Sequence, residues 1–285
     1  MMEDYTYTCV VYALLFLLAW TIVYALSPRA RTAMIWAGIA FAPAAIIGEL
    51  WHLQDYWSPI YVVQLKIGAW RFGGVEDYVF GFALAGISAG IFETLALRRG
   101  LPALPRISLP AYLRMAGFGA IGLLLTIVVT TLLPLKSMHA ATVAIALTAL
   151  LMFLLRPEVA PRALLTALAF AGFFWFFYAG IMIPLYPGMI DEFWMPQGNL
   201  GVRLFGVPLE EIVWGFSASL FAGPVLRVCS TTRPGSKKYT EPARAFKGDR
   251  GKTTVSATGL ADMSALLTSD VSRADHSRSS VSASG

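Results

Sequence analysis

Seven long apolar segments constrain this chain more than any other feature of its sequence. They are residues 9–27, 33–50, 75–97, 111–133, 138–155, 163–185 and 208–228. At about 1.5 Å per residue, helices of these lengths cover roughly 27–35 Å, which is close to the hydrocarbon thickness of a membrane. A spanning helix satisfies its own backbone hydrogen bonds, and the segments are too long for barrel strands. The sequence therefore predicts an all-α protein, a polytopic membrane bundle of seven transmembrane helices.

Composition excludes the main soluble classes. The chain is 57% hydrophobic and only 14% charged, whereas a soluble protein has about 25% charged residues. An ordinary cytosolic enzyme, a disordered protein and a disulfide scaffold are therefore excluded. The net charge of +5 comes from cations in loops and the tail, so no nucleic-acid partner is expected. Only two cysteines occur, with no Cys-x-x-Cys pattern and no His/Cys cluster, so no metal site is expected.

Positive charge predicts the orientation of the bundle. One set of loops carries Arg29, Arg31, Arg98, Arg99, Arg106, Arg114, Arg156 and Arg162, and the opposite set carries Lys66, Arg71, Lys136 and Arg203. Because the more basic loops stay inside, we expect a multi-pass protein of the cell membrane with its N-terminus outside. Residues 229–285 are polar and rich in small side chains, which predicts a disordered cytoplasmic tail. The transmembrane domain is then residues 1–228.

Two parts of the chain also resemble each other in sequence. The segment Asp55-Tyr-Trp57-Ser-Pro59 has the same pattern as Glu192-Phe-Trp194-Met-Pro196: an acid, an aromatic residue, Trp, any residue and Pro. Further on, Glu76-Asp-Tyr-Val-Phe-Gly-Phe82 matches Glu210-Glu-Ile-Val-Trp-Gly-Phe216 at an offset of 134 residues. These matches predict an internal repeat.

The repeat predicts the layout of the seven spans. Residues 9–97 form repeat one, 111–133 a linker helix and 138–228 repeat two. Four spans separate the two matched acidic helices, so both run in the same direction and the 3+1+3 repeats are parallel. Both acidic pairs should then lie at the same end of the bundle, where a site between the repeats is expected.

The acidic pairs are the candidate catalytic residues. Glu76 with Asp77 and Glu210 with Glu211 each lie in the first turn of an apolar helix. One acid there is explained by the helix dipole, to which it contributes about 0.3–1 kcal/mol. Two adjacent acids in both copies exceed what the dipole needs, and charge near hydrocarbon is costly. We therefore favour a functional role for all four.

Helical spacing suggests what chemistry these acids perform. Glu76 and Phe80 are four residues apart, as are Glu210 and Trp214, so each carboxyl group is expected to share a helix face with an aromatic ring. A carboxyl group buried beside a second one holds its proton more tightly and can act as a general acid. An aromatic face stabilises a cation. This combination suits a proton-initiated carbocation reaction on an apolar polyene.

Three further residues are candidates for lining a substrate site. Glu49 ends its predicted span on the same outer side and either joins the acids or only marks the end of the span. Trp57 and Trp194 belong to the repeated loop motif. Aromatic residues of these loops fit an interfacial belt, which is the favoured interpretation, and the mouth of a site for a long apolar ligand is the alternative.

The segment Gly206-Val-Pro-Leu-Glu-Glu211 resembles the Gly-Ile-Pro-x-Glu-Glu motif of the lycopene cyclase domain family, small integral-membrane carotenoid cyclases. The duplicated architecture and the Trp-x-Pro elements are similar too, over roughly residues 9–228. The resemblance implies closure of the linear ψ-ends of lycopene into β-rings, an isomerisation without net redox, metal or bound cofactor. It also implies catalytic roles for the two acidic pairs. The chain departs from the family at Gly74-Val75, where Pro and an apolar residue are expected, and at Asp77, which replaces Glu.

The leading hypothesis is thus an enzyme, an intramembrane isomerase that cyclises a carotenoid. A parallel-repeat transporter of small solutes and a non-catalytic carotenoid- or isoprenoid-binding membrane protein are the alternatives. The expected partners are a long apolar polyene or isoprenoid and membrane lipid. A second copy of the chain and enzymes of carotenoid synthesis are further candidates.

Overall fold

The computed structural model describes residues 5–98, 104, 107–198 and 200–230. Within these residues, seven helices are long and apolar enough to cross a membrane. They are α1 (Thr8–Leu26), α2 (Arg31–Asp55), α3 (Val75–Arg98), α4 (Leu109–Leu132), α5 (Ser137–Leu155), the composite sixth span (Pro157–Leu185) and α9 (Leu209–Ser230). The predicted all-α membrane bundle is confirmed, and helix ends fall within a few residues of the predicted ends except in α2, which continues to Asp55, and at the start of the sixth span.

The sixth span is helical throughout but not uniform. A short 3-10 turn (Pro157–Val159) leads into α6 (Ala160–Phe177). A π-helical segment (Tyr178–Met182) follows, and then the single turn α7 (Ile183–Leu185). Segments of π-helix inside α-helices are frequent at functional sites, and this one carries Tyr178 into the centre of the bundle.

Two small β-hairpins occupy loops for which the sequence analysis named no structure. Strands β1 (Gln64–Ile67) and β2 (Trp70–Gly74) pair in antiparallel fashion, and the chain passes from β2 directly into α3. Strands β3 (Arg203–Leu204) and β4 (Val207–Pro208) do the same before α9. Each acidic helix therefore begins where a hairpin ends.

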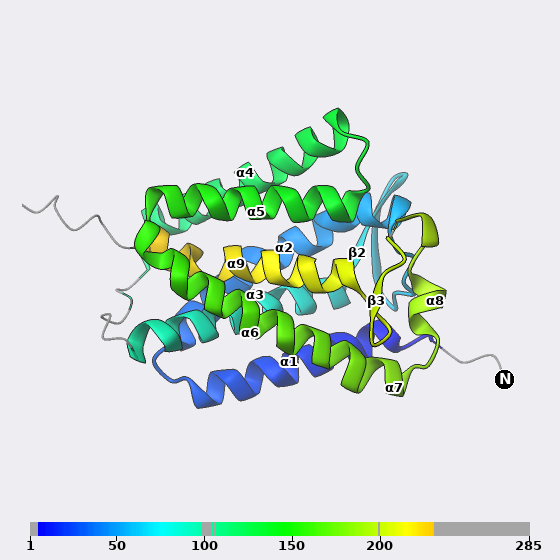
Figure 1. Ribbon diagram of the computed structural model, residues 1–285, viewed down its shortest axis with the longest axis horizontal. Helices are drawn as coiled ribbons and strands as arrows, with labels where there is room; N and C mark the ends of the chain where they lie inside the picture. The colour runs from blue at the N-terminus through cyan, green and yellow to red at the C-terminus, as the bar shows by residue number, and fades with distance from the viewer. Residues whose placement is uncertain (1–4, 99–103, 105–106, 199, 231–285) are drawn as a thin grey trace, which may run out of the picture. The chain divides into compact units, whose positions relative to one another are not determined.

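The two hairpin regions meet at one end of the bundle. They lie there together with the short helix α8 (Met189–Phe193), as Figure 1 shows. A bridge joins Trp57 to Trp194, and the Ser58 backbone N–H donates to the Phe193 carbonyl at 2.7 Å. The loops of the two halves are thus held to each other by backbone pairing.

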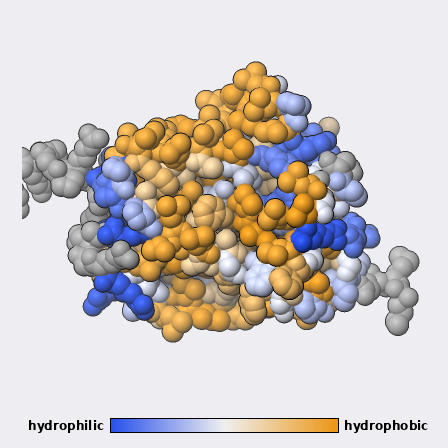
Figure 2. Space-filling view, viewed as in Figure 1, coloured by the Kyte–Doolittle hydropathy of each residue, from blue (hydrophilic) through white to orange (hydrophobic). Residues whose placement is uncertain are grey.

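Helices α3 and α9 form the centre of the bundle. In an apolar 18-residue stretch of each helix, 67% of the residues are buried in α3 and 72% in α9. Helix α3 packs against α1 and α2, α9 packs against α5 and α6, and α3 contacts α9. Helix α4 is the most peripheral span, with 11% of the residues in its apolar 18-residue stretch buried. Hydrophobic side chains cover the middle of the bundle and hydrophilic ones gather at both ends (Figure 2), as expected for a multi-pass membrane protein.

Side-chain hydrogen bonds fix the ends of several helices in the bundle. The Ser108 side chain accepts a hydrogen bond from the Ala111 backbone N–H at the start of α4. The Asp55 carboxylate accepts from the Ser137 hydroxyl at 2.6 Å and from its backbone N–H, and so ties the end of α2 to the start of α5. Helix α9 ends at Ser230. The rest of the predicted tail lies outside the described residues.

Candidate active site

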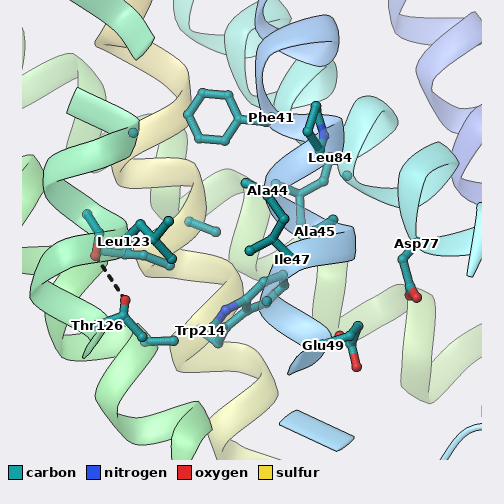
Figure 3. Close-up of a pocket in the computed structure, with 18 of the residues that line it drawn as sticks. Phe41, Ala44, Ala45, Ile47, Glu49, Asp77, Leu84, Leu123, Thr126 and Trp214 are labelled. Atoms are coloured by element: carbon teal, nitrogen blue, oxygen red, sulfur yellow. Dashed lines mark hydrogen bonds between the residues drawn. The ribbon is translucent and has the colours of Figure 1, made fainter. Parts of the chain in front are cut away.

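A cavity of about 430 Å³ lies between α2, α3, α4, α5 and α9. Its wall is mostly apolar, with three carboxyl groups: Glu49 from α2, Asp77 from α3 and Glu211 from α9. All three are buried, each between 5% and 7% exposed. Figure 3 shows Glu49 and Asp77 close together on one side of this cavity. Burying several acids is costly unless they are hydrogen-bonded or used, so their partners are informative.

Glu211 is held by two donors from loops at the hairpin end of the bundle. Its Oε1 accepts from the Tyr56 hydroxyl at 2.9 Å and from the Trp194 Nε1 at 2.9 Å. Burial, with the nearby charge of Glu211, raises the pKa of Tyr56 well above its usual value. The Tyr56 hydroxyl therefore remains a donor at any physiological pH. Both bonds fall on one oxygen, so Oε2 is the oxygen of Glu211 that can carry a proton.

Glu49 and Asp77 are the other two carboxyl groups of the cavity. The Trp57 Nε1 donates to Glu49 Oε2 at 2.6 Å, and the Gly74 backbone N–H donates to Asp77 Oδ2 at 2.8 Å. A Cβ at Gly73 would clash with the Asp77 carboxylate and lie 2.9 Å from Glu49 Cγ. The end of β2 thus passes so close to both acids that only glycine fits there.

The structure divides each acidic pair. The first acids point to loop backbone: Glu76 Oε1 accepts from the Val62 N–H at 2.8 Å, and Glu210 Oε1 accepts from the Leu200 N–H. The second acids, Asp77 and Glu211, line the large cavity. Glu76 instead borders an adjoining pocket of about 20 Å³. Within the described residues, the second oxygens of Glu76 and Glu210 have no hydrogen-bond partner.

Phe80 and Trp214 come together across the two halves. Their rings stack with centroids 6.1 Å apart and an interplanar angle of 21°, and both line the cavity. Asp77 and Glu211, which share the cavity with these rings, lie three residues before Phe80 and Trp214. The sequence predicted a spacing of four residues. A spacing of three also places two side chains on one helix face.

The two loop tryptophans are placed differently. Both border the small pocket, and of the two only Trp57 also lines the large cavity. Trp194 is buried, 4% exposed. Their rings lie 5.5 Å apart. Each indole N–H donates to a different carboxylate of the cavity. These contacts favour a role in the site over an interfacial belt.

Three tyrosines that are not among the predicted site residues complete the site. Tyr12, Tyr56 and Tyr178 line the cavity, and the Tyr178 hydroxyl bonds to that of Tyr12 at 3.3 Å. Tyr56 lies inside the repeated Asp-Tyr-Trp motif, which was a usable signal. Tyr12 and Tyr178 lie inside uniformly apolar spans, where nothing in the local pattern marks them.

A second polar feature lies far from the cavity's acids. The Arg227 Nε donates to Glu93 Oε1 at 3.0 Å, and Nη2 pairs with Oε2. Both residues are buried, Glu93 at 2% and Arg227 at 5% exposed. This pair joins α3 to α9. In the part of the chain that the structure describes, no group of three or more His, Cys, Asp or Glu residues could hold a metal ion.

Comparisons with known proteins bear on this site. Residues 136–228 match the family model described as lycopene cyclase. The matched segment contains α5, the sixth span, the second hairpin and nearly all of α9. It therefore includes Glu210, Glu211 and Trp214. No curated protein and no solved structure matches the chain.

Proposed function

We propose that the chain is an intramembrane isomerase that cyclises the ψ-end of a carotenoid, lycopene to a β-ring. The match of residues 136–228 to the family model described as lycopene cyclase supports this proposal. The observation that carries the proposal is the meeting of Glu49, Asp77 and Glu211 in one buried, largely apolar cavity. Such a cavity accepts a polyene end and excludes water, which would otherwise trap a cation.

The reaction needs only a proton donor, a proton acceptor and a shaped cavity. A carboxylic acid adds its proton to the terminal double bond of the ψ-end, which leaves a tertiary cation. The neighbouring double bond attacks this cation, and the new carbon–carbon bond closes a six-membered ring. A carbon next to the new cationic centre then loses a proton to a carboxylate, and the ring double bond forms. One proton enters and one leaves, so there is no net redox change.

We assign proton donation to Glu211. Two donors on Oε1 fix its orientation and leave Oε2 for the proton. Asp77 and Glu49, which line the same cavity, take the proton back. Glu76 and Glu210, which hold the loops that precede the hairpins, are positioning residues.

The aromatic wall supports the cationic stage. Phe80 and Trp214 line the cavity together, and an aromatic face within about 6 Å of a cation attracts it. Tyr12 adds a third ring, 5.0 Å from Phe80. The faces of these rings stabilise positive charge in the cavity.

Expression in a lycopene-accumulating bacterium tests the proposal. Membranes that contain the wild-type protein should convert lycopene into pigments with β-rings, which chromatography separates from lycopene. Unchanged lycopene, with the protein shown to be present in the membrane, would contradict the proposal. Lycopene that co-purifies unchanged would favour the non-catalytic binding protein, and solute flux in proteoliposomes would favour the transporter.

Adjacent glutamates provide a matched pair of variants. Glu211→Gln should lower turnover by about 10²–10⁴-fold, the usual contribution of a general acid. Glu210→Gln should keep most of the activity, because a glutamine oxygen still accepts from the Leu200 N–H. Glu192→Gln, an exposed change in the same loop region, controls for expression. An equal loss in the Glu210 and Glu211 variants would refute the assigned roles.

A further inference from the structure

The cavity is open on the side of α4. Four of its lining residues on α4 are exposed, and so are Pro43 and Ala44 on α2. The four are Ala116, Gly119, Ala120 and Leu123. Residues that line a cavity and are also exposed mark the place where the cavity meets the surface. Figure 3 shows Leu123 facing Ala44 across this space. The opening therefore lies between α2 and α4, and we call it the portal.

The portal lies at the middle of both spans. Pro43 is residue 13 of the 25 in α2, and Gly119 is residue 11 of the 24 in α4. The middle of a membrane-spanning helix lies at the centre of the hydrocarbon layer. The portal therefore faces lipid chains and not water, and an apolar molecule dissolved in the bilayer reaches it directly.

Small side chains keep the portal open. On α4 its rim consists of Ala116, Gly119 and Ala120, followed by Leu123. A Cβ built at Gly119 would meet nothing within 4 Å. The α4 side of the opening is thus unfilled space and not a packed helix contact.

The cavity beyond the portal suits one end of a long molecule. Along α9 its lining runs from Glu211 to Phe221, a rise of about 15 Å. Its volume of about 430 Å³ lies in the lower part of the roughly 300–1,000 Å³ range for sites of drug-sized ligands. A polyene long enough to cross a membrane therefore cannot be enclosed whole.

We propose that the portal between α2 and α4 admits one end of a long apolar polyene from the bilayer, while the rest of the chain stays in the portal and the surrounding lipid. The identity of the polyene rests on the proposed function. Each of two ψ-ends then enters in a separate binding event. A helix of a second copy, about 10–12 Å across, would cover the portal without reaching Glu211.

Two glycines of α4 provide the test. Gly117 and Gly119 are both exposed, and at both an added Cβ meets nothing within 4 Å. They are 200° apart around the helix, and Gly119 lines the cavity whereas Gly117 lies outside its described lining. Gly119→Phe should raise the apparent KM for lycopene by about 10–200-fold, the range for a small size mismatch in an apolar site, with kcat unchanged. Gly117→Phe should match the wild type.

A second pair guards against a folding defect at Gly119. Leu123, 39% exposed, lines the cavity, and Leu124, 60% exposed, lies outside the described lining. Leu123→Trp should raise KM as Gly119→Phe does, and Leu124→Trp should not. Membrane abundance of each variant is measured in parallel.

The outcomes separate the portal from the reaction. Conversion by the wild type, with equal KM values in the Gly117 and Gly119 variants, would overturn the portal and leave the proposed function standing. If the wild type retains lycopene without converting it, weaker retention by Gly119→Phe than by Gly117→Phe supports the portal alone. A changed oligomer size with unchanged KM would assign the opening to a second copy and overturn the portal. A wild type that neither converts nor retains lycopene overturns both proposals.

Discussion

Glu210 and Glu211 are neighbours in the chain with opposite environments. Consecutive helical residues point about 100° apart, so one carboxyl group of the doublet reaches the loop backbone while the other enters the cavity. Glu76 and Asp77 divide in the same way. An acidic doublet at the start of a helix thus combines a residue that fixes the loop with a residue free for chemistry.

The Tyr56 hydroxyl provides a prediction at this scale. Tyr56→Phe removes one of the two donors to Glu211 Oε1, and a hydrogen bond to the charge that Glu211 acquires as it gives up its proton contributes about 1.5–3 kcal/mol. We expect activity to fall by roughly ten- to a hundredfold. The raised pKa of Tyr56 keeps its hydroxyl protonated below about pH 10, so the deficit should be the same from pH 5 to 9.

Pigment assays across this pH range measure the effect. Tyr78→Phe, a change at an exposed tyrosine of α3, is the control and should behave as wild type. A deficit that disappears at one end of the pH range would show that the Tyr56 hydroxyl does not act as a constant donor.

Sequence reasoning found the four acids but not their orientations. Helical spacing alone allowed Phe80 to pair with Glu76 or with Asp77. The choice depends on how α3 is rotated against α1 and α2, and this rotation is set by packing. Likewise, Tyr56 is 155 residues from Glu211, and no local pattern predicts a bond across that separation.

At the scale of elements, α3 and α9 behave as equivalent helices. Each follows a two-stranded hairpin, begins with an acidic doublet and packs against two spans of its own half. Glu93 and Arg227, which pair between them, are 134 residues apart, the same offset as the sequence motifs. A two-fold axis between two helices would bring equivalent positions together, and the parallel repeat stays a prediction that this pair can test.

A charge swap tests this equivalence. Glu93→Gln alone should lower the free energy of unfolding by about 3–5 kcal/mol, because it removes the carboxylate that pairs with the buried Arg227 side chain. The double variant Glu93→Arg/Arg227→Glu should recover most of the loss, because equivalent positions offer similar surroundings. Thermal unfolding in detergent measures both. A double variant less stable than the single one would mean that the two positions are not equivalent.

The elements that sequence reasoning missed are short and local. The hairpins have strands of two to five residues, too few for an alternating pattern to stand out beside seven long spans. The π-helical segment Tyr178–Met182 lies in a run of apolar residues whose pattern predicts an ordinary α-helix. The long spans were predictable because length and hydrophobicity alone determine them.

At the scale of the whole bundle, the acids and the hairpins share one end. The N-terminal end of α1, both hairpins and α8 lie there (Figure 1), while the turn that carries Arg29 lies between the other ends of α1 and α2. The uneven distribution of cations predicts that the hairpin end is outside and the Arg29 turn inside. A substrate dissolved in the bilayer would then meet acids placed toward the outer leaflet.

Cysteine labelling in intact cells tests this orientation. Cys9 and Cys229 are both free and buried, so Cys9→Ala/Cys229→Ala provides a background in which only introduced thiols react. Arg71→Cys in the first hairpin and Arg29→Cys in the α1–α2 turn are both at exposed positions. A membrane-impermeant thiol reagent should label Arg71→Cys and leave Arg29→Cys unlabelled until the cells are opened. The reverse pattern would place the acids toward the cytoplasmic leaflet, because the hairpins and the acidic helix ends are one connected unit.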